Sequence, residues 1–219
     1  MLGLIRKNYF EAFRIKKNIF ESIFGYGIMA LFVAFGKDFY IFCLVTLIIF
    51  PLMGSTPLQY ALEQNEICKF DDILLTYPLT KKEIIGSQFL ACLSFCGITG
   101  IISLMTTFIY VYIHHTTDLK TGLLIWAAGL ILSLVFLAVS SVGFFALGNK
   151  KGTIVYIILV IFSAFSYAAT YTFTSAGIDF MVLFTLDVRI LLPIALVVSL
   201  LLLVGSYYLC LKIYTKRYS

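Results

Sequence analysis

The side chains that could do chemistry in this chain are few and far apart. The two histidines, His114 and His115, are adjacent, and two of the five cysteines, Cys92 and Cys96, lie one helical turn apart. A metal site needs further ligands beside such a pair, and the sequence offers none nearby. We interpret the histidines as solvated residues at a membrane interface and the cysteines as small packing residues.

A nucleotide-binding motif is also absent. A phosphate loop requires the pattern G-x-x-x-x-G-K-[ST], whereas Gly148-Asn-Lys-Lys-Gly152-Thr153 has glycine and lysine at other spacings. No ionisable residue lies in the middle of a predicted membrane span, although ion-coupled transporters usually need one there. The sequence therefore predicts no catalytic residue, metal or cofactor on this chain, and any work that requires energy would draw it from another chain.

The longest polar stretch is residues 63–83, which lies between two apolar runs. Ile67, Phe70 and Leu74 have the spacing that places apolar residues on one face of a helix, and we predict a short helix over 64–76. Acidic residues, among them Glu66 and Asp71, share this helix. An ordinary interfacial helix and a docking element for a soluble partner both fit this pattern.

The end of the same stretch carries a helix stop and a new helix start. Tyr77-Pro78 ends the short helix, because proline cannot continue the backbone hydrogen bonding. Thr80 and Glu83 fit a capping box, in which each side chain caps the other residue's backbone N–H. The sequence thus predicts a short helix parallel to the membrane, a turn and a sharply defined third span.

Composition predicts the elements that must hold this stretch in place. Hydrophobic residues make up 61% and charged residues 12% of the chain, against about 45–50% and about 25% in typical soluble domains. Apolar runs of about 18 residues or more are long enough to span a bilayer. We predict an all-α polytopic membrane protein, a single domain over 1–219, with six transmembrane helices at about 19–36, 39–62, 84–113, 122–147, 153–172 and 190–211.

The distribution of basic residues predicts the orientation of these spans. With both termini in the cytoplasm, thirteen of the sixteen lysine and arginine residues fall on the inner side, as the positive-inside rule requires. The net charge of +5 is therefore a topology signal and does not indicate a nucleic-acid partner. Residues 1–18 place apolar and polar residues on opposite helix faces, which predicts an interfacial helix on the inner leaflet; a basic tail that only sets the topology is the alternative.

Two spans carry unusual residues. The second contains Pro51, Gly54 and Pro57, which predict a kink that is either structural or a hinge. The fifth carries a polar cluster that would serve helix packing or line a substrate path, consisting of Ser163, Ser166, Tyr167, Thr170 and Tyr171. The outer segment 173–189 is mostly apolar, and the sequence leaves open whether it stays outside or re-enters the bilayer as short helices packed against protein.

The polar stretch also resembles a known family. The run Leu75-Thr-Tyr77-Pro78-Leu79-Thr80-Lys81-Lys82-Glu83-Ile84-Ile85, after an amphipathic acidic helix, is similar to the region between the second and third spans of type-2 ABC exporter permeases. The six-span layout, the basic amphipathic start and the lack of a soluble domain extend the resemblance. It is closest to small bacterial permeases that export amphipathic peptides, such as phenol-soluble modulins, or confer resistance to peptide antibiotics.

This resemblance implies a permease subunit in the bacterial plasma membrane. It implies two cytoplasmic ABC ATPase subunits as partners, and a second permease as a homodimer or related heterodimer, with the first and fifth spans at their interface. The 64–76 helix becomes a coupling helix, whose ATPase-coupling residues are Glu66, Phe70, Asp71, Leu74, Tyr77 and Pro78. A stand-alone transporter and a non-transporting immunity or assembly component remain open as alternatives.

Overall fold

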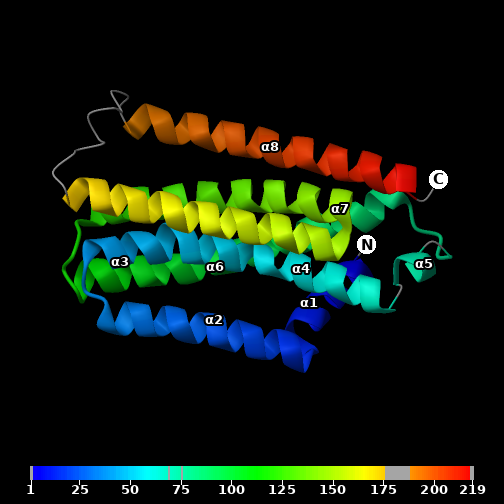
Figure 1. The fold of residues 1–219 in the computed structure, drawn as a ribbon, viewed down its shortest axis with the longest axis horizontal. Helices are drawn as coiled ribbons and strands as arrows, with labels where there is room; N and C mark the ends of the chain where they lie inside the picture. The colour runs from blue at the N-terminus through cyan, green and yellow to red at the C-terminus, as the bar shows by residue number, and fades with distance from the viewer. Residues whose placement is uncertain (1, 69, 75, 176–187, 218–219) are drawn as a thin grey trace.

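The structure, a computed structural model, describes residues 2–68, 70–74, 76–175 and 188–217. Every regular element in these ranges is a helix, and the long helices lie side by side (Figure 1). The elements are α1 (Leu2–Arg14), α2 (Lys16–Phe35), α3 (Phe39–Leu44), the π-helix η1 (Val45–Ile49), α4 (Phe50–Cys68), α5 (Phe70–Leu74), α6 (Lys81–Tyr112), α7 (Leu119–Ser175) and α8 (Val188–Arg217).

Five helices in the described ranges are long and apolar enough to cross a membrane. They are Lys16–Phe35, Phe39–Cys68, Lys81–Tyr112, Leu119–Phe173 and Ile190–Arg217. The fourth has 55 residues, which at 1.5 Å per residue would extend about 80 Å as a straight helix. Because a hydrocarbon core is only about 30 Å thick, this helix cannot be one straight span.

The chain reverses within α7 at Gly148, whose backbone is not helical, with φ 78° and ψ 175°. Figure 1 shows α7 running along the bundle and returning beside itself. Across the reversal the rings of Phe144 and Tyr156 lie 6.4 Å apart between centroids. The predicted spans 122–147 and 153–172 fall on the two sides of this glycine.

The second candidate span is continuous through α3, η1 and α4. Its irregular part is the π-helical turn, where the Phe50 N–H donates to the carbonyl of Val45 instead of the carbonyl one residue later. This turn directly precedes Pro51, and Pro57 lies inside α4. A π-turn of this kind is a usual place for a helix to change direction.

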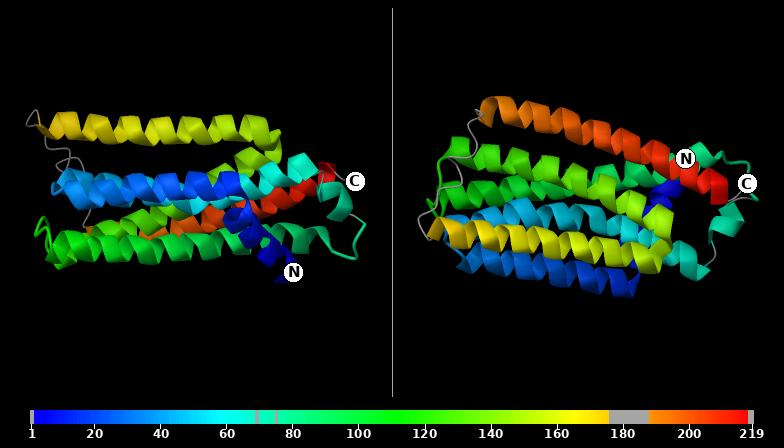
Figure 2. Two further views of the ribbon diagram at one scale, coloured as in Figure 1. Left: turned by 90° about the horizontal axis from the view of Figure 1, so that it is seen from below. Right: turned by 45° about the horizontal axis from the view of Figure 1, so that its top comes forward.

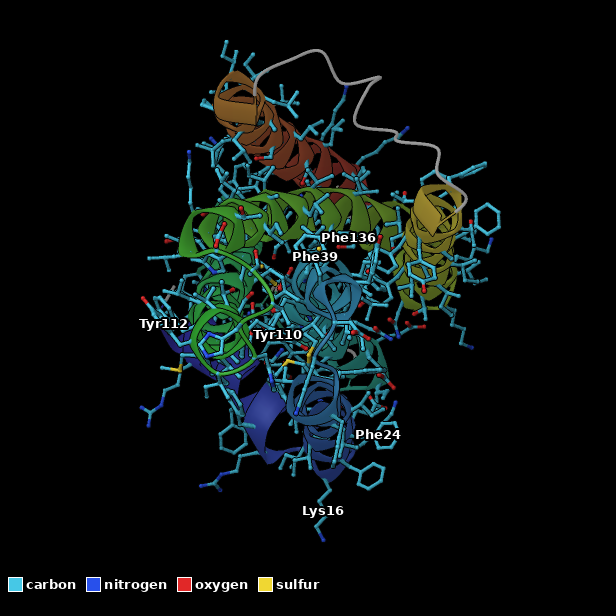
Figure 3. All side chains as sticks on the ribbon, turned by 90° about the vertical axis from the view of Figure 1, so that its left-hand side faces the viewer. Lys16, Phe24, Phe39, Tyr110, Tyr112 and Phe136 are labelled. Atoms are coloured by element: carbon cyan, nitrogen blue, oxygen red, sulfur yellow. The ribbon has the colours of Figure 1, made fainter. Side chains whose placement is uncertain are left out.

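The core lies where α4, α6, α7 and α8 meet. One cluster of buried side chains includes Leu58, Ile85, Phe89, Leu137 and Phe144 from these helices. A second cluster, where α2 and α3 pack on α6, includes Phe42 and the fully buried Tyr110. Figure 3 shows Tyr110 among the helices, whereas Phe24 of α2 points away from the bundle. The edge helices α2 and α8 therefore present apolar side chains outward, as a bilayer requires.

Both chain ends and α5 lie at one end of the bundle (Figure 2). We call this the terminal end; the connections from α2 to α3 and from α6 to α7 form the opposite end. The predicted interfacial helix over 1–18 is α1, which ends at Arg14 and packs on α6. There Tyr9 stacks on Phe95 at 4.5 Å between centroids, and its hydroxyl donates to Ser94 at 2.5 Å.

Candidate functional site

The connection between α4 and α6 at the terminal end differs from its sequence prediction. The helix predicted over 64–76 is two elements, because α4 continues to Cys68 and α5 has only five residues. Polar contacts stabilise this end of α4: Lys7 donates to Asn65 at 2.5 Å, and Lys17 pairs with Glu63 at 2.6 Å. Glu66 therefore lies exposed on the last turn of α4 and not on a separate helix.

Leu74 anchors the short helix α5 to the bundle. Its side chain is only 3% exposed and belongs to the main buried cluster, together with Ile84, Ile85 and Phe89 of α6. The apolar ridge predicted from helical spacing is therefore not wholly available to a partner. The sequence analysis placed Leu74 on the docking face. In the structure it is an internal packing residue, because α6 and its neighbours cover it.

Phe70 connects α5 to the N-terminal helix. The ammonium group of Lys7 lies 4.0 Å from the centroid of the Phe70 ring, a cation–π contact. The same ammonium pairs with Glu11 at 3.0 Å and bonds Asn65, so one side chain joins α1, α4 and α5. Sequence reasoning placed Lys7 only on the polar face of α1; its i, i+4 spacing from Glu11 was the available signal.

Glu11 is held in an environment that disfavours its charge. Burial raises the pKa of its carboxyl above the ordinary value, although the nearby Lys7 acts in the opposite direction. One carboxylate oxygen has no hydrogen-bond partner among the described residues. The joint between α1, α4 and α5 is thus a closely packed polar contact rather than a solvated one.

The turn after α5 leads into α6 through the predicted capping box, which is confirmed. The Thr80 N–H donates to the Glu83 carboxylate at 2.9 Å, and the Glu83 N–H donates to the Thr80 hydroxyl at 3.3 Å. The turn itself is closed by Thr76, whose N–H and hydroxyl both donate to the Ile73 carbonyl. These bonds fix the position of the turn relative to α6.

The outer face of this connection is apolar and uncovered. Ile67 is 66% exposed, Ile73 46% and Tyr77 58%, and Glu66 and Pro78 are exposed beside them. We call these five residues the coupling surface, after the role that the sequence resemblance implies for this segment. Of the sequence-predicted coupling residues, the side chain of Asp71 lies outside the described part of the structure, and Phe70 is half-buried.

The polar cluster of the fifth predicted span lies on the second half of α7. Ser163, Ser166 and Thr170 each donate to a carbonyl of their own helix. The two tyrosines face α3: Tyr167 donates to the Tyr40 carbonyl, and Tyr171 packs edge-on against the Tyr40 ring at 4.7 Å. Within this chain, the tyrosines therefore hold helices together.

His114 and the two neighbouring cysteines take packing positions in the described part of the chain. His114 contacts the Val33 carbonyl at 2.9 Å, which ties the opposite end of α6 to α2, and Cys92 and Cys96 are buried. In the parts of the chain that the structure describes, no group of three or more histidine, cysteine, aspartate or glutamate side chains could hold a metal ion.

One of three comparisons with known proteins identifies the class of the chain. No curated protein matches it significantly, and no solved structure does. Residues 3–215 match the sequence model described as ABC-2 family transporter protein, which covers nearly the whole chain. With its long apolar helices, the chain is an integral membrane protein, and it belongs to the ABC-2 family of transporter proteins, the type-2 ABC permeases.

Proposed function

We propose that this chain is the membrane-spanning subunit of an ATP-driven exporter, with a separate cytoplasmic ATPase docked at the terminal end. ATP and Mg²⁺ bind that ATPase and not this chain. The two halves of α7 count as separate spans in this proposal, which gives six crossings and places both termini in the cytoplasm. The reversal at Gly148 and the length of α7 support this count.

The observation that carries the proposal is the coupling surface. Large exposed apolar side chains outside a bilayer usually mark a protein contact, because water does not favour them. Here Ile67, Ile73 and Tyr77 gather on the connection between α4 and α6, the segment that resembles the coupling region of type-2 exporters. The acidic Glu66 beside them would set the register of a partner.

Contacts beneath the coupling surface connect it to several helices of the bundle. Leu74 fixes α5 to the buried cluster, the capping box fixes the turn to α6, and Lys7 fixes α5 to α1 and α4. A displacement of the surface by a closing ATPase dimer would therefore move several helices together as rigid bodies.

We further propose an amphipathic peptide or another hydrophobic molecule as the cargo. The buried polar side chains in the described part of the chain are asparagine, glutamine, serine and threonine, with no buried Asp, Glu, Lys or Arg. Such an interior suits an apolar or amphipathic molecule better than a free ion. A second permease copy completes the proposed assembly, and Ser166 and Thr170, exposed on α7, lie on a face open to it.

The test is copurification of the ATPase with variants of the coupling surface. Ile73→Asp and Tyr77→Ala should each weaken ATPase binding. For Tyr77→Ala the expected loss is roughly 30-fold, which corresponds to an interface anchor residue worth about 2 kcal/mol. Thr121→Asp is the matched control, because it adds a carboxylate to an exposed position at the opposite end of the bundle. Wild-type ATPase binding in both coupling variants would exclude this surface as the docking site.

A transport assay separates the exporter from a stand-alone transporter. Vesicles containing this chain and its ATPase should accumulate an amphipathic peptide only when ATP is supplied. Equal accumulation by vesicles that lack the ATPase would contradict ATP coupling.

A further inference from the structure

A long apolar groove opens between α8 and both halves of α7. It has a volume of about 620 Å³, and its walls include Val142 from the first half of α7, Val155 from the second half, and Leu202 and Leu209 from α8. Figure 3 shows α8 and the second half of α7 on either side of the first half. Its lining is almost wholly apolar, which suits the hydrocarbon region of a bilayer.

An open basic pocket of about 510 Å³ lies along α8 toward the terminal end, and all its lining residues belong to that helix: Tyr208, Leu211, Lys212, Thr215 and Lys216. The residues Leu202, Leu209, Lys212 and Lys216 are separated by seven, three and four positions, which places them on one face of the helix. We call the groove together with these two lysines the track, which is apolar along its length and basic at one end.

The dimensions of the track match one leaflet of a bilayer. The groove residues on α8 extend from Val198 to Leu209, which is about 16 Å at 1.5 Å per residue. A hydrocarbon core about 30 Å thick gives each leaflet about 15 Å. Lys212 lies one turn beyond Leu209, where phospholipid head groups begin.

The charges at the end of the track are available to an anion. No salt bridge to Lys212 or Lys216 occurs among the described residues. The ammonium of Lys81 lies 3.5 Å from the carbonyl of Thr215, another residue of the pocket, and so adds a third positive charge nearby. Basic pockets at the cytoplasmic side of membrane helices suit anionic lipid head groups.

The groove has open space beside α8 at Gly205. A side chain at Gly205 would meet nothing within 4 Å, so the space beside it is open. Ser206 also lines the groove; it is only 4% exposed, and its hydroxyl has no hydrogen-bond partner among the described residues. This hydroxyl oxygen is covered by protein, so Ser206 contributes to the wall of the groove and not to a polar contact with an occupant.

We propose that this track binds one anionic phospholipid, with an acyl chain in the groove and the phosphate at Lys212 and Lys216. The lipid would come from the cytoplasmic leaflet, an assignment that rests on the orientation given in the proposed function. A helix of a second copy is a poorer occupant, because twofold packing on this face would bring the lysines of the two copies together.

The experiment uses the purified full-length chain in detergent with equal amounts of phosphatidylglycerol and phosphatidylcholine, and counts bound lipids by native mass spectrometry. Wild-type protein should prefer phosphatidylglycerol. Replacing both lysines (Lys212→Gln with Lys216→Gln) should lower this preference roughly 25-fold, at about fivefold for each charge near the membrane surface. Lys150→Gln with Lys151→Gln is the matched control, because it removes two charges from the same end outside the track, and it should keep the preference.

A second variant tests the groove without changing any charge. Gly205→Leu fills the open space and should abolish retention of both lipids, while leaving the elution volume of the protein unchanged. Excess inorganic phosphate should not displace the bound lipid, because the acyl chain contributes to its binding.

Three results would overturn the proposal. They are equal lipid retention in wild type and all variants, displacement by phosphate alone, and a wild-type dimer that Gly205→Leu converts to a monomer whatever the lipid. The last would assign the groove to a second copy. No ATPase is present in this assay, so a negative lipid result would not bear on the proposed exporter function. In the same way, failure of the ATPase copurification would not bear on lipid binding in the track.

Discussion

Ile73 and Leu74 show how adjacent residues on α5 take opposite roles. Leu74 is buried in the main cluster, whereas Ile73 is exposed on the coupling surface. Leu74→Ala should lower the free energy of unfolding by about 2–5 kcal/mol, the usual cost of a cavity at a packed leucine. Ile73→Ala should change it by only about 0.5 kcal/mol, as exposed substitutions do, yet weaken ATPase binding. Denaturant titration of both variants in detergent measures the difference, and equal losses would mean that Leu74 is not packed.

The same pair marks a limit of sequence reasoning about the site. Helical spacing places Leu74 on one face with Ile67 and Phe70, but spacing cannot show which part of that face the chain itself covers. The cluster that receives Leu74 draws on residues as distant in sequence as Leu4 and Tyr214. The contact between Lys7 and Phe70 likewise joins helices that are far apart along the chain. Only the folded arrangement reveals these contacts.

At the scale of elements, the reversal of α7 depends on one backbone conformation. Gly148 has φ 78° and ψ 175°, a region that is essentially restricted to glycine. Gly148→Ala should therefore lower the free energy of unfolding by about 1–3 kcal/mol. Gly97→Ala is the matched control: a side chain meets nothing within 4 Å at either glycine, but Gly97 is helical, and alanine there should be neutral or stabilising by up to about 1 kcal/mol. Thermal unfolding in detergent compares the two variants, and equal effects would contradict a strained reversal.

Sequence patterns predicted the elements well where the signal is local. The capping box of Thr80 and Glu83 depends on only four consecutive residues, and both of its hydrogen bonds are present in the structure. The predicted helix over 64–76 was wrong in its bounds, because contacts from Lys7 and Lys17 stabilise the polar end of α4 and extend it to Cys68. Polar residues at 63–66 look like the start of a loop when those tertiary partners are unknown.

At the scale of the whole molecule, the arrangement of charges and the reversal of α7 together predict the topology. Lys150 follows the reversal at the terminal end, whereas Lys37 lies in the connection from α2 to α3 at the opposite end, and both are exposed. If α7 crosses the membrane twice, these two residues lie on opposite sides of it. If α7 does not return, an odd number of crossings would separate the two termini and lose the bias of basic residues toward one side.

Single cysteines at these two positions test the topology. In a Cys68→Ser background, which removes the exposed native thiol, a membrane-impermeant maleimide should label Lys37→Cys in intact cells. It should label Lys150→Cys only after the membrane is permeabilised. The background protein without added cysteines is the control and should stay unlabelled from outside. Labelling of Lys150→Cys in intact cells would place the reversal of α7 outside the cell, and a coupling surface at the same end could then not reach a cytoplasmic ATPase.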